Sequence, residues 1–322
     1  GRTFWQPKGH SLMKRRVVIT GIGLINPIGS GVDEVWSAVQ NQKSGISAKT
    51  DEDIPSLPIA YGGFIRDFMP AKIVSNRKSL KVMCRDIQMG VVASYLAKTD
   101  AALEENSYEP TRAGCCIGAG IFEHDPEEMA DSFKAAMQDG KFDIRKFGSE
   151  GMGQLFPLWL LKYLPNMPAC HITIAHNLRG PSNTITADSA GSASAIEESI
   201  RVIERGTADI MFCGGAESRL YHTGLLRFHT QGILRNGHSN GEYTLFSKDS
   251  SGLIAGEGGA ILILEELEHA KKRGAKIYAE IKGFFTSSEG EAKPNASTLA
   301  RNMQNAIQKA NTELSTINGV FA

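Results

Sequence analysis

The sequence lacks an excess of either charge. Its 322 residues include 35 Lys+Arg and 35 Asp+Glu, which leaves no formal net charge at pH 7. A balanced chain has no net attraction for nucleic acid or for an anionic membrane surface, so we expect neither as a partner. The start of the sequence also lacks the long apolar run of a signal peptide or membrane span, which predicts a cytoplasmic protein. Residues 1–12, which precede Met13, are interpreted as a vector remnant or a loose extension.

Cofactor and metal motifs are missing as well. The sequence contains no P-loop pattern, and after Gly21-Ile22-Gly23 the third glycine position of a dinucleotide fingerprint is occupied by Asn26. We therefore interpret Gly21 and Gly23 as packing glycines in a tight turn and expect no cofactor. No CxxC pair occurs, so buried reduced thiols are expected and no metal site. The five cysteines are Cys84, Cys115, Cys116, Cys170 and Cys213.

Apolar periodicity predicts alternating strands and helices, which is typical of a layered α/β fold. The length is sufficient for a sizeable core. A region rich in Asn, Gly and Ser, from Leu234 to Ser251, is predicted to be a long loop. The predicted strands are Val17 to Thr20, Cys115 to Gly118, His171 to Ala175, Asn183 to Thr186, Asp209 to Cys213, Ala260 to Leu264 and Ile277 to Ile281. The predicted helices are Val32 to Val39, Pro126 to Met137, Leu155 to Leu164, Ser189 to Arg205 and Thr298 to Lys309.

The most informative segment runs from Gly180 to Gly191, where an extended stretch turns abruptly into a helix. Such a turn presents one side chain above a helix N-terminus, whose free N–H groups stabilise negative charge on a reacting oxygen. Ser189 occupies this position and is flanked by Asp188, Ala190 and Gly191. The geometry suits an acyl-transfer nucleophile. A serine, however, is a far weaker nucleophile than a thiolate unless a base removes its proton.

Two other interpretations of Ser189 stay open from the residues alone. The serine could simply cap the helix N-terminus. Alternatively, Ala187-Asp188-Ser189-Ala190-Gly191 resembles the Gly-x-Ser-x-Gly elbow of serine hydrolases, which requires a later histidine. The available histidines are His222, His229, His238 and His269, none in a distinctive context, and His269 is expected on a solvated helix face.

Glycine-rich runs follow two of the predicted strands. Gly214-Gly215-Ala216-Glu217 is interpreted as a tight turn that contains an acid, and the run from Gly252 to Gly259 as a close-packed backbone crossing. Taken in order with the other segments, these runs make the chain resemble the β-ketoacyl-acyl-carrier-protein synthase family from Arg15 to Ala322. The stretches that carry the resemblance are Arg15–Gly23, Asn26–Gly29, Gln42–Ile46, Gly180–Ser182, Gly206–Met211, Gly214–Glu217, Gly256–Gly258 and Leu264–Ala270.

The resemblance implies a cysteine nucleophile, two histidines and a lysine, together with an acyl carrier protein as partner. A gapless count from Gly180-Pro181-Ser182 to Gly206 places Ser189 on the cysteine position. The resemblance also implies an acid that Glu289 supplies, but the histidine that usually follows it is absent. Val320-Phe321-Ala322 aligns with the strand before the first catalytic histidine, so neither histidine nor the lysine can be assigned.

In these departures the chain resembles the chain-length factors, which are ketosynthase-like subunits that lack the cysteine and pair with an active ketosynthase. The leading interpretation is therefore a non-condensing subunit that shapes a partner's acyl tunnel. The alternatives are an active β-ketoacyl synthase or acyltransferase that uses Ser189 with histidines beyond Ala322, and, more remotely, a serine hydrolase. Pairing is expected through the strand Asn183 to Thr186, in a homodimer or heterodimer, with Ile121 to Met167 covering the interface.

The resemblance further implies a thiolase-like fold with two similar halves in α/β/α/β/α layers. On this basis residues 13–275 form the first half with a cap insertion, and residues 276–322 begin a second half that is incomplete in this chain. We expect the chain to be part of a longer protein.

Overall fold

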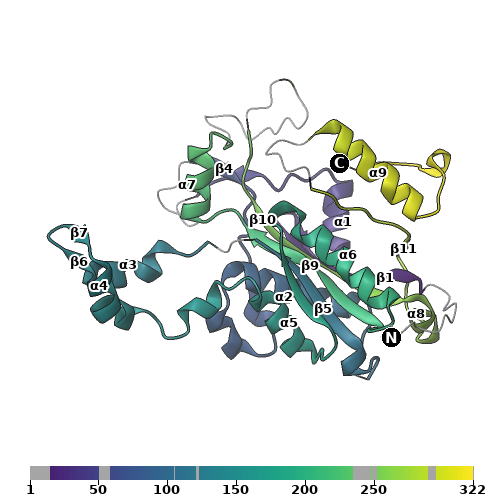
Figure 1. Ribbon diagram of the computed structural model, residues 1–322, viewed down its shortest axis with the longest axis horizontal. Coiled ribbons are helices and arrows are strands. Elements are labelled where there is room, and N and C mark those ends of the chain that lie inside the picture. Colours follow the sequence, from purple (N-terminus) through teal and green to yellow (C-terminus); the bar gives the residue numbers. More distant parts are fainter. Residues whose placement is uncertain are drawn as a thin grey trace, which may run out of the picture.

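A seven-stranded mixed sheet forms the centre of the protein, in the strand order β11-β1-β10-β9-β5-β8 with β2 paired to β1 (Figure 1). The computed structural model describes residues 15–50, 59–104, 106–120, 123–234, 248, 252–288 and 295–321. Strand β5 is parallel to β8 and β9, whereas β10 is antiparallel to β1 and β9, and β11 is antiparallel to β1. The strands are β1 (Val17–Asn26), β2 (Gly29–Ser30), β5 (Ala113–Ala119), β8 (Ser182–Thr186), β9 (Ile210–Ser218), β10 (Glu257–Glu266) and β11 (Ala279–Ile281). Two small hairpins add β3 (Ser47–Ala48) with β4 (Tyr61–Gly62) and β6 (Met137–Gln138) with β7 (Lys141–Phe142).

Helices cover both faces of this sheet. On one face α2 (Arg85–Asp100) and α5 (Met167–His176) pack over β1, β10, β9 and β5, and on the other α6 (Gly191–Glu204) packs over β5, β9 and β8. Each face has its own apolar cluster, built around Ile87 and Phe212 on the α2 side and around Ile203 and Met211 on the α6 side. The remaining helices are α1 (Val32–Gln40), α3 (Pro126–Ala135), α4 (Ile144–Lys146), α7 (His222–Thr230), α8 (Leu267–Lys272) and α9 (Ala296–Lys309).

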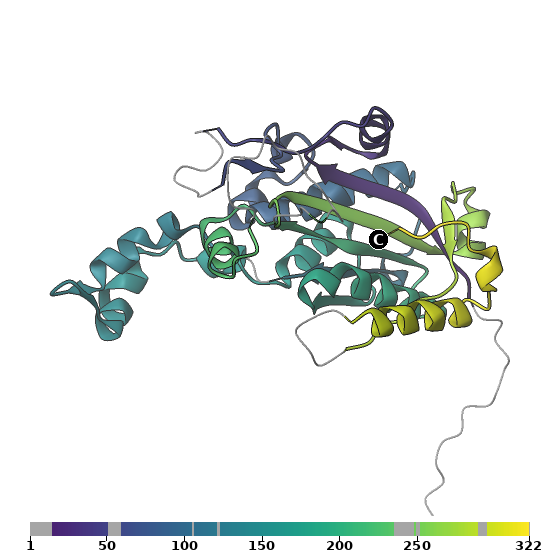
Figure 2. The same cartoon turned by 90° about the horizontal axis from the view of Figure 1, so that it is seen from above.

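An excursion leaves the end of β5 and returns at α5. It carries α3, the β6–β7 hairpin and α4, and it projects away from the sheet in both views (Figures 1 and 2). Its own core is a cluster of three tilted rings, Phe133, Phe142 and Phe147, with centroids 5.5 to 6.0 Å apart. Because Phe133, Phe142 and Ile144 are 43%, 45% and 70% exposed, the described residues leave much of this apolar surface uncovered.

Most predicted elements are confirmed, but two are wrong. The segment predicted as a strand from His171 to Ala175 lies inside helix α5. Its β-branched residues suit a strand, yet Pro168 at the first turn and a left-handed Asn177 at the end stabilise a helix. The helix predicted over Leu155 to Leu164 is also wrong, since only the short 3₁₀ turn Trp159–Lys162 forms there.

The glycine runs lie in strands rather than in the predicted tight turns. Gly21 and Gly23 belong to β1, where a Cβ at either position would collide with the backbone of α2 at Ala93 or Ala97. Gly214 to Glu217 continue β9 as far as Ser218, in register with β10. The interpretation of Gly21 and Gly23 as packing glycines is therefore confirmed, and the turn is not. Most of the predicted loop from Leu234 to Ser251 lies outside the described residues.

Candidate functional site

The turn that joins β8 to α6 is the centre of the candidate site. Asp188, Ser189 and Ala190 form a single 3₁₀ turn, and α6 begins directly after it at Gly191. The backbone of Asp188 is left-handed, with φ of 44°. A non-glycine residue rarely adopts this conformation without a structural cause, and such residues cluster at functional sites. The predicted abrupt turn into a helix is thus confirmed, with the helix beginning two residues after Ser189.

Glycines beneath the turn allow α6 to begin so close to the sheet. A Cβ at Gly118 of β5 would collide with the backbone of Gly191 and Ser192, and one at Gly215 of β9 would collide with the Ser192 hydroxyl. Only residues without side chains permit this approach. The first turn of α6 therefore lies directly against the ends of two neighbouring parallel strands.

Ser189 itself is exposed, and among the described residues its hydroxyl makes no hydrogen bond. Helix α6 has no side-chain cap at its N-terminus, so the capping interpretation is wrong. The side chain of this turn that does interact is that of the preceding residue, Asp188. The Asp188 carboxylate accepts a hydrogen bond of 2.6 Å from Arg219, and the same guanidinium donates to Glu217 at 2.9 Å.

Burial raises the pKa of Glu217, and the nearby Asp86 and Asp188 raise it further, although Arg219 opposes the rise. One arginine therefore serves two carboxylates, which concentrates negative charge beside the turn. Arg219 also stacks over the ring of Phe228, 5.4 Å from its centroid. This fixes the guanidinium against an aromatic face.

A second, buried network holds the segment that carries Arg219. Asp86, which is 1% exposed, accepts hydrogen bonds from the Ser218 backbone N–H at 2.6 Å and from the Tyr221 hydroxyl at 2.7 Å. Burial raises the pKa of Asp86. The Ser218 hydroxyl donates to Glu257, which also forms a two-pronged ion pair with Arg85 at 2.6 Å. Ser218 and Tyr221 are fixed on either side of Arg219, so α2 sets the position of the arginine indirectly.

Two cavities meet at the turn. The larger, of about 800 Å³, is lined by Thr186, Asp188, Glu217, Arg219, Tyr163 and Phe228 among others. The smaller, of about 370 Å³, lies along the ends of β1, β5, β9 and β10 and includes Ser192 in its wall. Gly120, Asp188 and Glu217 line both cavities, whereas Ser189 lines neither. Asp188 is thus the residue of the turn that lines both of these open cavities, although its side chain is 72% exposed.

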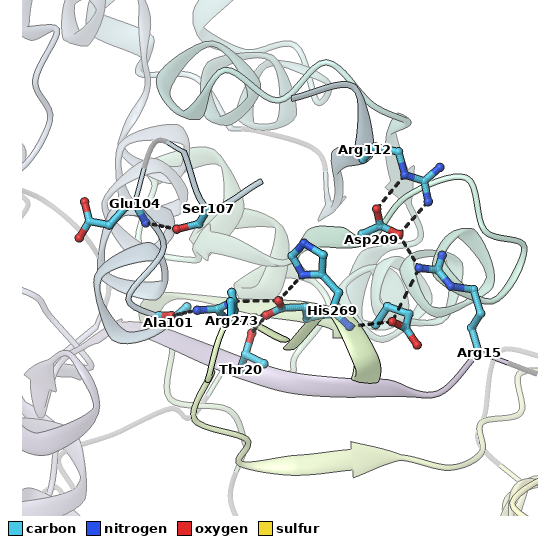
Figure 3. A network of polar contacts seen from close by, with 11 residues as sticks. Arg15, Thr20, Ala101, Glu104, Ser107, Arg112, Asp209, His269 and Arg273 are labelled. Atoms are coloured by element: carbon cyan, nitrogen blue, oxygen red, sulfur yellow. Dashed lines mark hydrogen bonds and ion pairs between the residues drawn. The ribbon is translucent and has the colours of Figure 1, made fainter. Parts of the chain in front are cut away.

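A different polar cluster lies at the opposite ends of the strands (Figure 3). Glu265, which is fully buried, accepts hydrogen bonds from Thr20, His269 and Arg273 at 2.6 to 2.8 Å. Arg273 also donates to the carbonyl of Ala101 at 2.9 Å, which ties the end of α2 to β10. The expectation that His269 lies on a solvated face is therefore wrong, because its ring is 26% exposed and is bound to Glu265.

Other candidate residues are dispersed. His222 and His229 lie on α7, and no described hydrogen bond joins either to Ser189. His171 and His176 lie in the core on the far face of the sheet, where burial lowers both pKa values, that of His176 to about 3. Glu289 and His238 lie outside the described residues.

Within the described residues, no group of three or more His, Cys, Asp or Glu side chains is arranged to hold a metal ion. In the same part of the chain, no helix is long and apolar enough to cross a membrane. Four of the five cysteines are buried and Cys170 is partly exposed.

Comparison with known proteins identifies the family. The family described as "Beta-ketoacyl synthase, N-terminal domain" matches residues 14–270. The chain belongs to the β-ketoacyl synthase family. The 3-oxoacyl-[acyl-carrier-protein] synthase 2 of Vibrio cholerae is 32% identical over 280 residues, which cover 86% of this chain and 64% of that protein. The chain thus spans slightly less than two thirds of that relative's length.

Solved β-ketoacyl synthases share the fold. A β-ketoacyl synthase from Burkholderia phymatum superposes with a TM-score of 0.80 at 29% identity, covering 94% of this chain and 72% of the other. A structure described as the ishigamide ketosynthase/chain length factor superposes with a TM-score of 0.76 at 26% identity, covering 95% and 72%. The family and the thiolase-like α/β fold implied by the sequence are confirmed. The division at residue 275 stays a prediction.

The sequence did not identify the residues that make most of the contacts at the turn. Arg219, Asp86 and Tyr221 were not predicted as site residues, and they carry the ion pair and its support. Asp86 comes from α2, whereas Arg219 and Tyr221 follow β9 more than 130 residues later, so no local spacing pattern could have marked them. The acid in Gly214-Gly215-Ala216-Glu217 was the one available signal.

Proposed function

We propose that this chain is a non-condensing, chain-length-factor-type subunit that shapes the acyl tunnel of a partner ketosynthase. The observation that carries the proposal is the state of the turn at the start of α6. Its exposed Ser189 has no hydrogen-bonded base among the described residues, and the carboxylate beside it is held by Arg219. Serine without a positioned base lacks an effect that typically contributes about 100-fold to 10,000-fold in rate.

The partners proposed are an acyl carrier protein and a ketosynthase-like subunit. The similarity to a 3-oxoacyl-[acyl-carrier-protein] synthase supports the first, and the similarity to a ketosynthase/chain length factor structure supports the second. Strand β8 lies at one edge of the sheet, and its residues are exposed or half-buried. An exposed edge strand can pair with the same strand of a second subunit.

The excursion between β5 and α5 also supports an interface on this side of the protein. It begins after β5, the strand that pairs with β8, and it carries exposed apolar side chains such as Leu158 and Leu160, 47% and 59% exposed. Apolar surface of this extent is typical of protein interfaces. We therefore propose that residues 123–167 cover the interface that β8 begins.

The decisive experiment is acylation. The whole protein is incubated with an acyl-carrier-protein thioester, and its intact mass is measured beside a Ser189→Ala variant and an active β-ketoacyl synthase as positive control. We expect no mass shift for the natural chain. A shift that disappears in Ser189→Ala would instead establish an active acyltransferase. Ester hydrolysis that depends on Ser189 would establish a hydrolase.

A further inference from the structure

A segment of three residues, Arg219 to Tyr221, joins the end of β9 at Ser218 to the start of α7. Within the segment, the Arg219 N–H donates to the Gly256 carbonyl at 2.9 Å. Its two ends are held by a single side chain, because Asp86 of α2 accepts from the Ser218 N–H at 2.6 Å and from the Tyr221 hydroxyl at 2.7 Å. Asp86 therefore connects α2 to both ends of the segment that carries Arg219.

The Asp86 carboxylate is buried without a cation of its own. It is 1% exposed, and its third contact is the neutral Cys84 thiol at 3.7 Å. Within the described part of the chain no ion pair includes Asp86, because the guanidinium of the adjacent Arg85 binds Glu257 through two hydrogen bonds of 2.6 Å. Neutral donors return only part of the solvation that a carboxylate loses on burial, so the ionised form is held here at a cost in free energy.

The other ionisable groups around Asp86 do not remove this cost. They are Cys84 and Arg85 at the start of α2, Glu217 on β9, Tyr221 on the segment, and Glu257 on β10, which acts through Arg85. Arg85 is the one cation among them and is shared with Glu257, whereas Glu217 carries the same charge as Asp86. Burial is the largest cause that acts on Asp86, and it raises the pKa although the hydrogen bonds from Tyr221 and Ser218 oppose the rise.

The direction of the pH effect follows from a comparison of two states of the segment. When the segment moves away from α2, water reaches Asp86, and its pKa returns toward the ordinary value of 3.8. The closed state thus binds the proton more tightly than the open state does. Closure is therefore favoured in acid, and it loses free energy as the pH rises from about 3.8 to the raised pKa of the closed state.

We propose that Asp86 makes the segment from Arg219 to Tyr221 a pH-sensitive latch, which is closed in mild acid and opens more often as the pH rises. In the closed state the segment keeps the Arg219 guanidinium on Asp188 and Glu217. In the open state the guanidinium leaves these carboxylates, so the charge beside the turn depends on the pH. The inference goes beyond the proposed function and does not rest on it, since the latch requires no acyl transfer.

Amide hydrogen exchange of the whole protein tests the latch. Exchange at the Ser218 N–H is measured by NMR from about pH 4.5 to about pH 8 and is corrected for the rate of an unstructured peptide at each pH. We expect the opening constant at about pH 7.5 to exceed that at about pH 5 by about 10-fold or more, because one pKa unit changes such an equilibrium up to tenfold. The amide of Phe212, in the middle of the same strand, is the internal reference and should show no such rise.

Variants separate Asp86 from other causes. Asp86→Asn keeps the size of the side chain but cannot titrate, so the corrected exchange at Ser218 should be independent of pH. Tyr221→Phe removes a hydrogen bond that favours the ionised form, so the rise should extend to a higher pH than in the natural protein. Asp131→Asn, which alters an exposed carboxylate on α3, is the matched control and should keep the natural profile.

Three results would overturn the proposal. They are exchange at Ser218 in the natural protein that is flat or falls with rising pH, an Asp86→Asn profile that equals the natural one, and a Tyr221→Phe profile that moves to lower pH. The measurement on the natural protein does not depend on the folding of any variant. Acylation of Ser189 would refute the non-condensing role and leave the exchange profile unchanged, so failure of the two proposals is distinguishable.

Discussion

The Asp209 carboxylate should make stability depend on pH in a defined window. It lies directly before β9 and is bound by Arg112 through two hydrogen bonds of 2.7 Å and by Arg15 (Figure 3). The hydrogen bond from Arg112 is the largest cause that lowers its pKa, from 3.8 to about 2. Because the pKa is depressed in the folded state, the stabilisation is present above about pH 4 and is lost as the pH falls toward about 2.

The size of this stabilisation follows from the same two pKa values. A fall from 3.8 to about 2 corresponds to about 2.4 kcal/mol at neutral pH. The Arg112 and Asp209 side chains are 38% and 21% exposed, so solvent screening reduces this to about 1 to 2 kcal/mol. The perturbation is Asp209→Asn. The assay is urea unfolding of both proteins from pH 6 to about pH 2.5, which gives the difference in their free energies of unfolding.

We expect this difference to shrink by about 1 kcal/mol across that range, which is about two thirds of the full effect, because Asp209 is protonated in the unfolded chain at pH 2.5 and begins to be protonated in the folded protein as well. Asp131→Asn is the matched control. Asp131 is 80% exposed, and its one ion pair among the described residues is with Lys134, which is 77% exposed, so its difference should stay near zero. A difference for Asp209→Asn that is independent of pH, or that grows in acid, would refute the reasoning.

Two further predictions concern packing and thiol chemistry. Gly23→Ala should destabilise the protein by about 1 to 3 kcal/mol or more in thermal unfolding, because the new Cβ would collide with the Ala93 carbonyl. The control is Gly153→Ala, which should be near neutral because its Cβ would enter open space. At pH 8 a disulfide reagent should modify Cys170 first in the native protein, and Cys170→Ser should abolish this fast phase. Burial raises the pKa of Cys116 to about 11, so only about one part in a thousand is thiolate; rapid modification there would contradict the burial.

Most strands could be predicted because each is a short run of β-branched or apolar residues that is bounded by polar or glycine residues. Asn183 to Thr186 and Ala260 to Leu264 lie within β8 and β10. The same rule failed at His171 to Ala175, where a β-branched run forms a helix because the packing of α5 on β5 overrides local propensity. Helix α2 was missed entirely. It is buried around much of its circumference, so it lacks the one-sided apolar periodicity that marks a surface helix.

Part of the candidate site could likewise be predicted from the sequence, and part could not. The turn at Ser189 could be predicted from local sequence, since an extended run, a short polar turn and a helix are consecutive in the chain. The Arg219–Asp188 pair joins residues that are 31 positions apart in the chain. Asp86 lies 132 positions from Ser218, whose backbone N–H donates a hydrogen bond to it. Such contacts depend on sheet order, which no single segment encodes.

The glycines under α6 separate the shape of the turn from its chemistry. Gly118 and Gly215 determine how closely the helix approaches the strands, and neither carries a reactive group. The exposed residue at the crest, Ser189, contributes nothing described to that packing. A single substitution there can therefore change reactivity while the scaffold keeps its form. An ancestral enzyme could lose its nucleophile, and a descendant could regain one, without refolding any part of the sheet.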